Sequence, residues 1–368
     1  MGAYLVILNT YFIASLINKK KYIFYFFTFF IFVGLRMETG YDWPVYNTYF
    51  TTNLKENFSN FEFGYVLWNR LLQNFGTTEI ILNIGNILLF LGLLFIILKK
   101  TVKNIGLFFY IYVFMDMLIL NMAIIRQGIS ILFFYLMVIY FDKKKRYIYY
   151  LLSISFHKSS LIYLPLLYIV KKKYNQKIIY ILFMIGIFIF FIRIPYIFNI
   201  LELLSKFQIF EKLKYYLTVD KPILSLYQIF YAIKNIFLLI ILEIIKSDKS
   251  KKNCMYYNIA LINLLCFFYL YEVPTLYQRV ENITSIGFII YICNSFENIS
   301  KIKKIIFYAI TFCYFNIMFI YFLTRPLSVV YVPYQNYLYT KKSSGWERTK
   351  KLYKELNSLF KEEMFKDI

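Results

Sequence analysis

The sequence predicts an all-α, polytopic integral membrane protein, a helical bundle with about 11 or 12 membrane spans. Of its 368 residues, 60% are hydrophobic and 22% are aromatic, well above the usual level of soluble domains. Apolar runs of 15 to 24 residues recur along the chain, and only helices or closed barrels satisfy their backbone hydrogen bonds in lipid. These runs do not alternate apolar and polar residues as barrel strands do, so helices are predicted.

The apolar runs give the expected elements in order. We expect spans at residues 3–18, 22–35, 79–98, 105–120, 124–141, 147–170, 178–194, 223–245, 254–271, 280–296 and 303–323. The first run is followed, not preceded, by lysines, so it is expected to be a first span and not a cleaved signal peptide. The chain then divides into a membrane domain at 1–323, with a polar loop at 36–78, and a C-terminal tail at 324–368.

The basic residues predict how the spans are oriented. The formal net charge is +22, and 34 of the 42 basic residues are lysines. The lysines form short clusters between spans, which is the positive-inside pattern of membrane proteins and argues against a nucleic-acid partner. The clusters expected in the cytoplasm lie at 19–21, 99–103, 143–146, 171–173, 246–252 and 301–304. The N-terminus and the loop at 36–78 are then expected outside.

Residues 147–170 do not fit a single crossing of the membrane, because basic clusters flank them at both ends and both clusters are expected in the cytoplasm. A short hairpin, with its turn at His157-Lys158-Ser159-Ser160, would return the chain to the cytoplasmic side. A helix from residue 147 to 157 rises only about 16 Å, roughly half the hydrocarbon core. We expect the tip to reach a water-filled cavity, where irregular backbone is tolerated.

The arginines follow a different distribution from the lysines. Six of the eight fall on the expected outer side: Arg36, Arg70, Arg126, Arg193, Arg279 and Arg325. Arginine presents a planar fork that binds carboxylates and phosphates through two hydrogen bonds, which lysine cannot do. The pattern predicts an anion-binding site facing outward. The alternatives are structural: Arg126 could snorkel to the interface or pair with Asp116, and Arg279 could pair with Glu281.

Three residues are candidates for proton transfer. His157 is the only histidine, and Asp42 and Glu62 lie in the polar loop. The alternatives are a structural histidine and carboxylates that merely neutralise Arg36 or Arg70. No spacing of His, Cys or Asp suggests a metal site, so no metal or cofactor is expected, and the four cysteines are expected to be free.

The tail is expected to form an amphipathic helix on the membrane surface. Its apolar residues recur every four positions, at Leu352, Leu356, Phe360 and Met364.

The order of motifs resembles the EpsG family of bacterial Wzy-type polysaccharide polymerases. The motifs are Gly34-Leu-Arg36, Gly40-x-Asp42, Tyr46, Glu62-x-Gly64-Tyr65, Ile125-Arg126-Gln127, Phe156-His157-Lys158-Ser159, Gln278-Arg279 and Val332-Pro333-Tyr334. This resemblance implies a helical fold of the GT-C-like glycosyltransferase type in the bacterial cytoplasmic (inner) membrane. It implies an enzyme that joins undecaprenyl-diphosphate-linked oligosaccharide units into capsule, O-antigen or exopolysaccharide outside the membrane, without a nucleotide sugar.

The resemblance also implies roles for individual residues. Arg126, Arg279 and Arg36 would hold the lipid diphosphate, and His157 or Asp42 would take the acceptor proton. Glu62 would serve as a further base or bind sugar hydroxyls. The residues expected to bind sugar are Tyr41, Trp43, Tyr46, Tyr65, Gln127 and Gln278.

The expected partners are the lipid-linked donor and acceptor, the bilayer, a chain-length regulator and a flippase. The rival functions are an O-antigen-type ligase, a lipid-linked oligosaccharide flippase or transporter, and an acyltransferase that uses His157. A flippase usually shows internal repeats, which this sequence lacks.

Overall fold

The computed structural model describes residues 1–17, 21–52, 61–172, 174–193, 226–245, 251–340 and 343–365, with the single positions 199 and 203. Over these residues the chain is helical, with one isolated β-bridge between Arg36 and Asn336, so the all-α prediction is confirmed. The expected connector at 195–222 and the lysine clusters at 19–21 and 246–252 lie largely outside the described residues.

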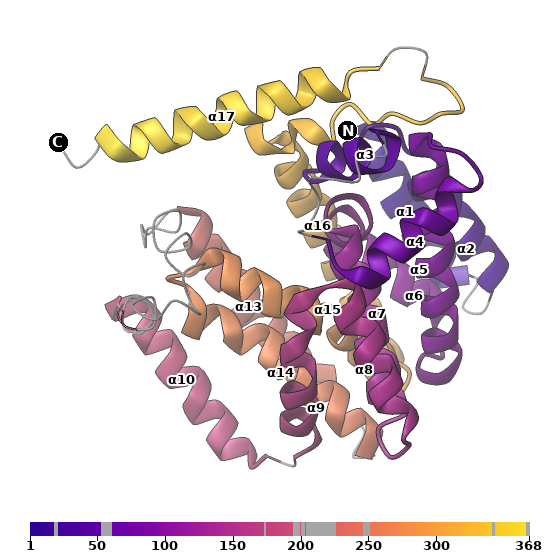
Figure 1. Cartoon of the computed structure of the whole chain (residues 1–368). Coiled ribbons are helices and arrows are strands. Elements are labelled where there is room, and N and C mark those ends of the chain that lie inside the picture. Colours follow the sequence, from indigo (N-terminus) through magenta and orange to yellow (C-terminus); the bar gives the residue numbers. More distant parts are fainter. Residues whose placement is uncertain are drawn as a thin grey trace. The chain divides into compact units, whose positions relative to one another are not determined.

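The chain divides into two compact units, whose helices carry the labels of Figure 1. Unit 1 comprises Met1–Leu167 and Ser300–Ile368, and unit 2 comprises Tyr168–Ile299. The helices of unit 1 are α1 (Gly2–Ile17), α2 (Tyr22–Phe29), η1 (Phe30–Gly34), α3 (Trp43–Thr52), α4 (Phe63–Gln73), α5 (Glu79–Thr101), α6 (Ile105–Met115), η2 (Met117–Ala123), α7 (Ile125–Ile139), α8 (Lys145–Phe156), η3 (Lys158–Ile162), α16 (Lys301–Thr324), η5 (Pro326–Val330) and α17 (Gly345–Phe365). Helix α9 (Tyr163–Lys171) crosses the boundary, and unit 2 holds α10 (Gln176–Ile192), α13 (Leu226–Ile245), α14 (Lys251–Leu270) and α15 (Pro274–Phe296).

Helical structure occurs at every position where a span was expected. By length and composition, two helices of the described part are long and apolar enough to cross a membrane, α5 and α16. The pair α6 and η2 passes the same criterion as one span with a 72° bend at Asp116. The other apolar helices are shorter than a full crossing, so the number of 11 or 12 spans stays a prediction.

The chain reverses direction at His157, as the sequence analysis expected. Helix α8 packs along α7, where the Ser153 hydroxyl is 2.9 Å from the Ser130 hydroxyl. After the turn, the Ser160 hydroxyl also bonds Ser130, at 2.5 Å, and the next ring, Tyr163, packs on Phe134. Both arms therefore meet the same stretch of α7. Hydroxyl side chains hold this turn because buried backbone groups there need hydrogen-bond partners.

The loop at 36–78 contains two helices that the apolar pattern did not predict, α3 and α4. Gly64 lets α4 approach α8, because a Cβ atom at this position would lie 2.3 Å from the Ser155 hydroxyl oxygen. This close approach brings Glu62, which immediately precedes α4, to the turn at His157.

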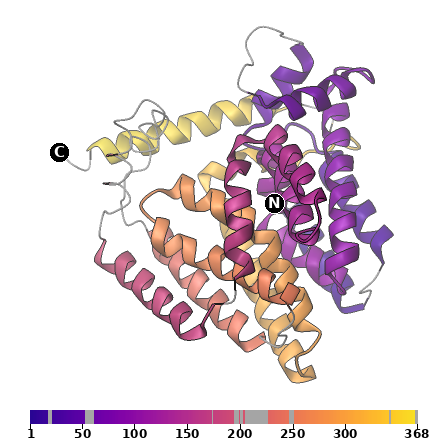
Figure 2. The ribbon, with the colours of Figure 1, turned by 60° about the horizontal axis from the view of Figure 1, so that its bottom comes forward.

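Unit 2 is a bundle in which α14 and α15 lie side by side, as the orange helices of Figures 1 and 2 show. Within this unit Glu281 accepts a hydrogen bond from Lys234 at 2.9 Å and another from the Tyr231 hydroxyl. Glu281 is thereby held by Lys234 and Tyr231.

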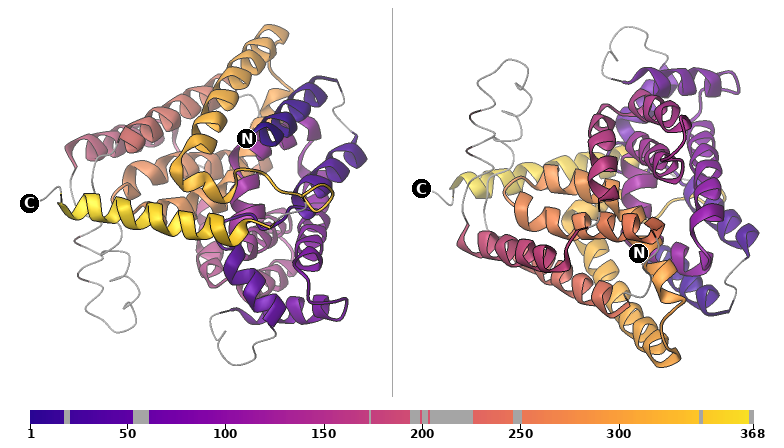
Figure 3. Two further views of the ribbon diagram at one scale, coloured as in Figure 1. Left: turned by 90° about the horizontal axis from the view of Figure 1, so that it is seen from above. Right: turned by 90° about the horizontal axis from the view of Figure 1, so that it is seen from below.

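Helix α17 lies within the tail at 324–368. It begins beside α3 (Figure 3). At this point Trp346 packs edge to face on Trp43, with ring centroids 5.2 Å apart. Leu352 of the expected apolar face is buried against protein in this first part of the helix. The side chains from residue 357 onward lie outside the described residues.

Candidate active site

Most of the expected site residues of unit 1 lie at one end, which we call the arginine end. It comprises the described part of 36–78, the start of α7, the turn at His157 and the segment 325–352. Hydrogen bonds join these four pieces: Arg126 to Glu62, Lys158 to Glu62, Gly40 to Val330 and Arg348 to Glu38. The opposite end, which we call the lysine end, holds the clusters at 99–103 and 143–146 around Tyr140.

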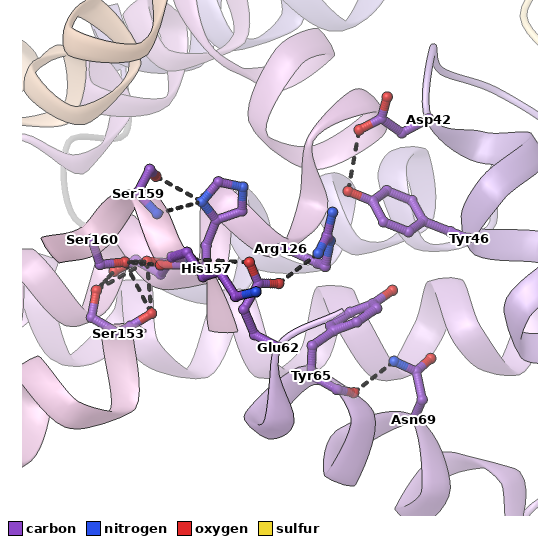
Figure 4. A network of polar contacts seen from close by, with 12 residues as sticks. Asp42, Tyr46, Glu62, Tyr65, Asn69, Arg126, Ser153, His157, Ser159 and Ser160 are labelled. Carbon is purple, nitrogen blue, oxygen red and sulfur yellow. Dashed lines mark hydrogen bonds and ion pairs between the residues drawn. The ribbon is translucent and has the colours of Figure 1, made fainter. Parts of the chain in front are cut away.

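Glu62 is the centre of the candidate site (Figure 4). Its Oε2 atom pairs with Nη1 of Arg126 at 2.5 Å, and its Oε1 atom accepts the Lys158 amide at 3.0 Å. One carboxylate thereby ties the start of α7 to the turn of the α8–α9 hairpin. The pairing of Arg126 with Glu62 replaces the expected alternatives, in which Arg126 paired with Asp116 or Glu62 neutralised Arg36 or Arg70.

Aromatic rings surround the Arg126 guanidinium. The Phe61 ring lies 4.4 Å from its central carbon, and the Tyr46 and Tyr65 rings lie at 5.7 and 5.8 Å. Cation–π contacts of this kind stabilise a charged group by about 0.5–2 kcal/mol, more where water is excluded. The rings and Glu62 together fix where the guanidinium lies before any ligand binds.

Asp42 and Tyr46 complete the cluster. The Tyr46 hydroxyl donates to Oδ2 of Asp42 at 3.3 Å, with Asp42 directly before α3 and Tyr46 in its first turn. Burial raises the pKa of Asp42 above its usual value, while the nearby Arg126 charge and the Tyr46 hydroxyl lower it. Burial also raises the pKa of Tyr65 to about 12, so this phenol stays neutral near pH 7.

His157 caps the short helix that follows it. Its Nδ1 atom accepts the Ser159 amide at 3.2 Å and lies 2.6 Å from the Ser159 hydroxyl oxygen. Because Nδ1 accepts a hydrogen bond from an amide, the neutral ring of this arrangement carries its proton on Nε2. In Figure 4 the ring lies to the left of the Glu62 carboxylate and Arg126 lies to its right.

The structure brings together five of the expected site residues in unit 1. They are Asp42, Tyr46, Glu62, Tyr65 and Arg126, with His157 joined to them through Lys158 and Glu62. The sequence analysis assigned no role to Phe61, although its ring is the nearest to Arg126. Its position directly before Glu62 was the one feature of the sequence that could have indicated a role for Phe61.

Other expected site residues make contacts outside the cluster around Arg126 and Glu62. Arg36 is only 2% exposed and its Nη1 atom donates to the Val33 carbonyl at 2.7 Å, while its backbone pairs with Asn336. A guanidinium so enclosed is part of the interior of unit 1 in this structure. Gln127, which follows Arg126 on α7, is buried as well.

The aromatic residues expected to stack on sugar are mostly enclosed. Tyr46, Tyr65 and Trp43 are buried, because their rings contact Arg126 or Trp346. Tyr41 alone of the four is exposed, and its hydroxyl donates to the Leu327 carbonyl at 3.1 Å.

Arg279 and Gln278 lie in unit 2, near the start of α15, and both are exposed. Among the described residues, no group of three or more His, Cys, Asp or Glu side chains is arranged to hold a metal ion.

The apolar helices, with a charged cluster at one end of unit 1, define an all-helical integral membrane protein. A family model for the EpsG family matches residues 2–336, so this chain belongs to the EpsG family. Membership indicates a polysaccharide polymerase-like role that acts on lipid-linked saccharides in a membrane. No curated protein and no solved structure matches the chain.

Proposed function

We propose that this protein joins undecaprenyl-diphosphate-linked oligosaccharide units into a surface polysaccharide on the outer face of the bacterial cytoplasmic membrane. The observation that carries the proposal is the Arg126 guanidinium, held by Glu62 and three aromatic rings at the end of an apolar bundle in an EpsG-family chain. The fold proposed is of the GT-C-like type, and a flippase and a chain-length regulator are the proposed partners.

The proposed reaction transfers the growing chain to the incoming unit. A hydroxyl oxygen of the incoming unit attacks the anomeric carbon of the growing chain, and the bond from that carbon to the lipid diphosphate breaks. The hydroxyl proton passes to a base, and the diphosphate leaves with an additional negative charge. Fixed cations in a water-poor site stabilise such developing charge without having to reorganise.

Arg126 is the residue we assign to the diphosphate in unit 1. Its guanidinium is oriented before binding, so little conformational entropy is lost when the ligand arrives. Arg279, an exposed arginine in the second turn of α15 in unit 2, is the other residue that we propose for the diphosphate. Glu62 keeps Arg126 in place, and its carboxylate is the proposed ligand for sugar hydroxyls.

Asp42 is the better candidate for the general base. Its pKa is raised by burial, and a base functions best when its pKa approaches the working pH. His157 is assigned a different role, because its Nδ1 atom is already an acceptor for the Ser159 amide. In that tautomer Nε2 is a donor, suited to a phosphate or leaving-group oxygen. Tyr41, Gln127 and Gln278 remain proposed sugar ligands, with Tyr46, Tyr65 and Trp43 supporting the site.

The test is the length distribution of surface glycan in a deletion strain that carries wild-type protein or the variants Arg126→Ala, Arg279→Ala and His157→Ala. Arg70→Ala is the matched control, because Arg70 is an exposed arginine of α4 at the same end of unit 1. Protein levels are measured in every strain. The proposal expects single repeat units in the deletion and in the Arg126 and Arg279 variants, and long chains in the Arg70 variant.

Two other outcomes would indicate a different function for this protein. Long chains that are made but not attached to their final acceptor would indicate a ligase. Repeat units that accumulate on the cytoplasmic face of the membrane would indicate a flippase, and Arg126 would then line a transport path.

A further inference from the structure

The first turn of α17 is held by one carboxylate from the loop at 36–78. Oε2 of Glu38 accepts the amides of Ser344 and Gly345 at 3.0 and 2.6 Å, and Oε1 accepts the Ser343 hydroxyl at 2.5 Å. The N-terminal amides of a helix have no partner within the helix, and a carboxylate there is stabilised by the helix dipole. Glu38 therefore caps α17 from a segment about 300 residues earlier in the chain.

Arg348 closes the same arrangement from the other side. Its Nη2 atom donates to the Glu38 carbonyl at 2.6 Å and to Oε1 of Gln335 at 2.8 Å, and Nη1 donates to the Pro333 carbonyl at 2.9 Å. The side chain is only 5% exposed. A buried guanidinium requires such partners, since its desolvation is otherwise costly. We call the hydrogen bonds of Glu38 with 343–345 and of Arg348 with Glu38 and Gln335 the tail clasp.

The tail clasp holds a turn at residues 38–40 whose backbone conformation is constrained. Glu38 has φ of 51° and Gly40 has φ of 117°, both in the left-handed region. At Gly40 a Cβ atom would lie 1.8 Å from the Met122 carbonyl oxygen, so only glycine fits. The Gly40 amide also donates to the Val330 carbonyl at 3.4 Å.

This turn touches the site on two sides. Asp42 follows Gly40 by two residues, and Met122 precedes Arg126 by four. The turn at 38–40 therefore lies between the tail and the two residues that we assign to the base and the diphosphate.

We propose that the tail clasp is a positioning element for the polymerase site, and that Arg348 and Glu38 act through the turn at 38–40 on Asp42 and Arg126. The inference rests on the proposed function for its activity readout. The match to the family model ends at residue 336, so residues 343–348 lie beyond the matched segment. Neither Arg348 nor Glu38 was among the site residues that the sequence suggested.

The experiment first measures the turn directly, without reference to activity. Thr39 is fully buried in the turn, so a Thr39→Cys reporter reacts with a maleimide only when the turn opens. The four native cysteines are replaced by serine, and labelling rates are measured on purified full-length protein in detergent. Arg348→Ala removes three hydrogen bonds of a charged group, and Glu38→Gln weakens the hydrogen bonds that the carboxylate accepts, so each should raise the labelling rate by at least about tenfold.

Two truncations provide a matched pair. Ending the chain after residue 344 removes α17 with Arg348, whereas ending it after residue 356 keeps Arg348 and the buried Leu352. The first truncation should raise labelling and shorten the glycan, and the second should change neither. Arg348→Lys should restore part of the glycan length, because one donor can still reach the carbonyl groups.

The outcomes are distinguishable from failure of the proposed function. Unchanged labelling in Arg348→Ala and Glu38→Gln overturns the clasp. Raised labelling with wild-type glycan length, while Arg126→Ala abolishes long chains, shows that the turn opens without effect and overturns its positioning role. If Arg126→Ala also leaves long chains, the proposed function fails, and positioning of a polymerase site fails with it.

Discussion

At one end of unit 1 the Arg126 guanidinium pairs with Glu62 at 2.5 Å and lies against Phe61. At the other end Lys100, Lys143 and Lys145 extend from the surface around the half-buried Tyr140. The two ends are joined by α7, which rises about 22 Å between them. The lysines need only supply charge, which water solvates. The arginine is partly buried, so its partners and its planar shape determine whether it can stay charged and oriented.

The largest expected effect comes from replacing Arg126. Arg126→Ala should lower the rate of repeat-unit joining in membranes by about 100- to 1000-fold, because a preoriented cation is lost from the developing charge. Arg126→Lys should recover little of this rate, since lysine lacks the planar fork. Lys100→Arg is the matched exchange at the lysine end, and it should leave the rate unchanged. A fully active Arg126→Lys protein would contradict the distinction between the two ends.

A smaller effect is expected from the packing that brings Glu62 to the hairpin. In Gly64→Ala the new Cβ atom would lie 2.3 Å from the Ser155 hydroxyl oxygen, so α4 and α8 must separate. Overpacking of this kind costs about 1–3 kcal/mol, which thermal unfolding can measure. Gly92→Ala of α5 is the control, because nothing lies within 4 Å of its Cβ position. It should be neutral or stabilising by up to about 1 kcal/mol. Equal losses in both variants would refute the proposed contact.

The pH dependence of the rate tests the role of Asp42. A base must be deprotonated, so activity should rise with pH through the Asp42 pKa, which burial places above the usual value. The Tyr46 hydroxyl lowers that pKa, so Tyr46→Phe should move the acid limb to higher pH. The measurement is the initial rate against pH for both proteins. An unmoved limb in Tyr46→Phe, or a limb that persists in Asp42→Asn, would assign the base to another residue.

The smallest effects are expected at the lysine end. Lys143→Gln and Lys145→Gln should change the unfolding free energy by less than about 0.5 kcal/mol, because exposed charges contribute little. The joining rate should stay within about twofold of wild type, since surface substitutions rarely disturb a distant site. Losses as large as those of Arg126→Ala would show that both ends take part in function.

The positions of the helices could be predicted from the sequence. Each apolar run became helical, and the two basic clusters around 147–170 correctly indicated a reversal of the chain. Such features depend on residues near in sequence and on hydropathy, which a single chain displays directly. The helices α3 and α4 were not predicted, because their residues mix polar and aromatic side chains in a loop.

The candidate site could be predicted only as a set of residues. The sequence named Asp42, Glu62, Arg126 and His157, but it left open which carboxylate paired with which arginine. Glu62 lies 64 residues from Arg126, and the tertiary packing at Gly64 decided that these two meet. The burial of Arg36 could not be predicted either, because the sequence shows that this arginine follows an apolar run but not which residues surround it.

The sequence by itself therefore determined the helical architecture, the different distributions of arginines and lysines along the chain and the family to which the chain belongs. These depend on composition, local periodicity and the order of short motifs. Only the tertiary structure decided the partner of Arg126, the tautomer of His157 and the capping of α17 by Glu38. The first and the last are contacts between segments far apart in the chain, whereas the tautomer follows from the local contact of Nδ1 with the Ser159 amide. Each partner is selected because a partly buried charge or amide must find a partner in the folded protein.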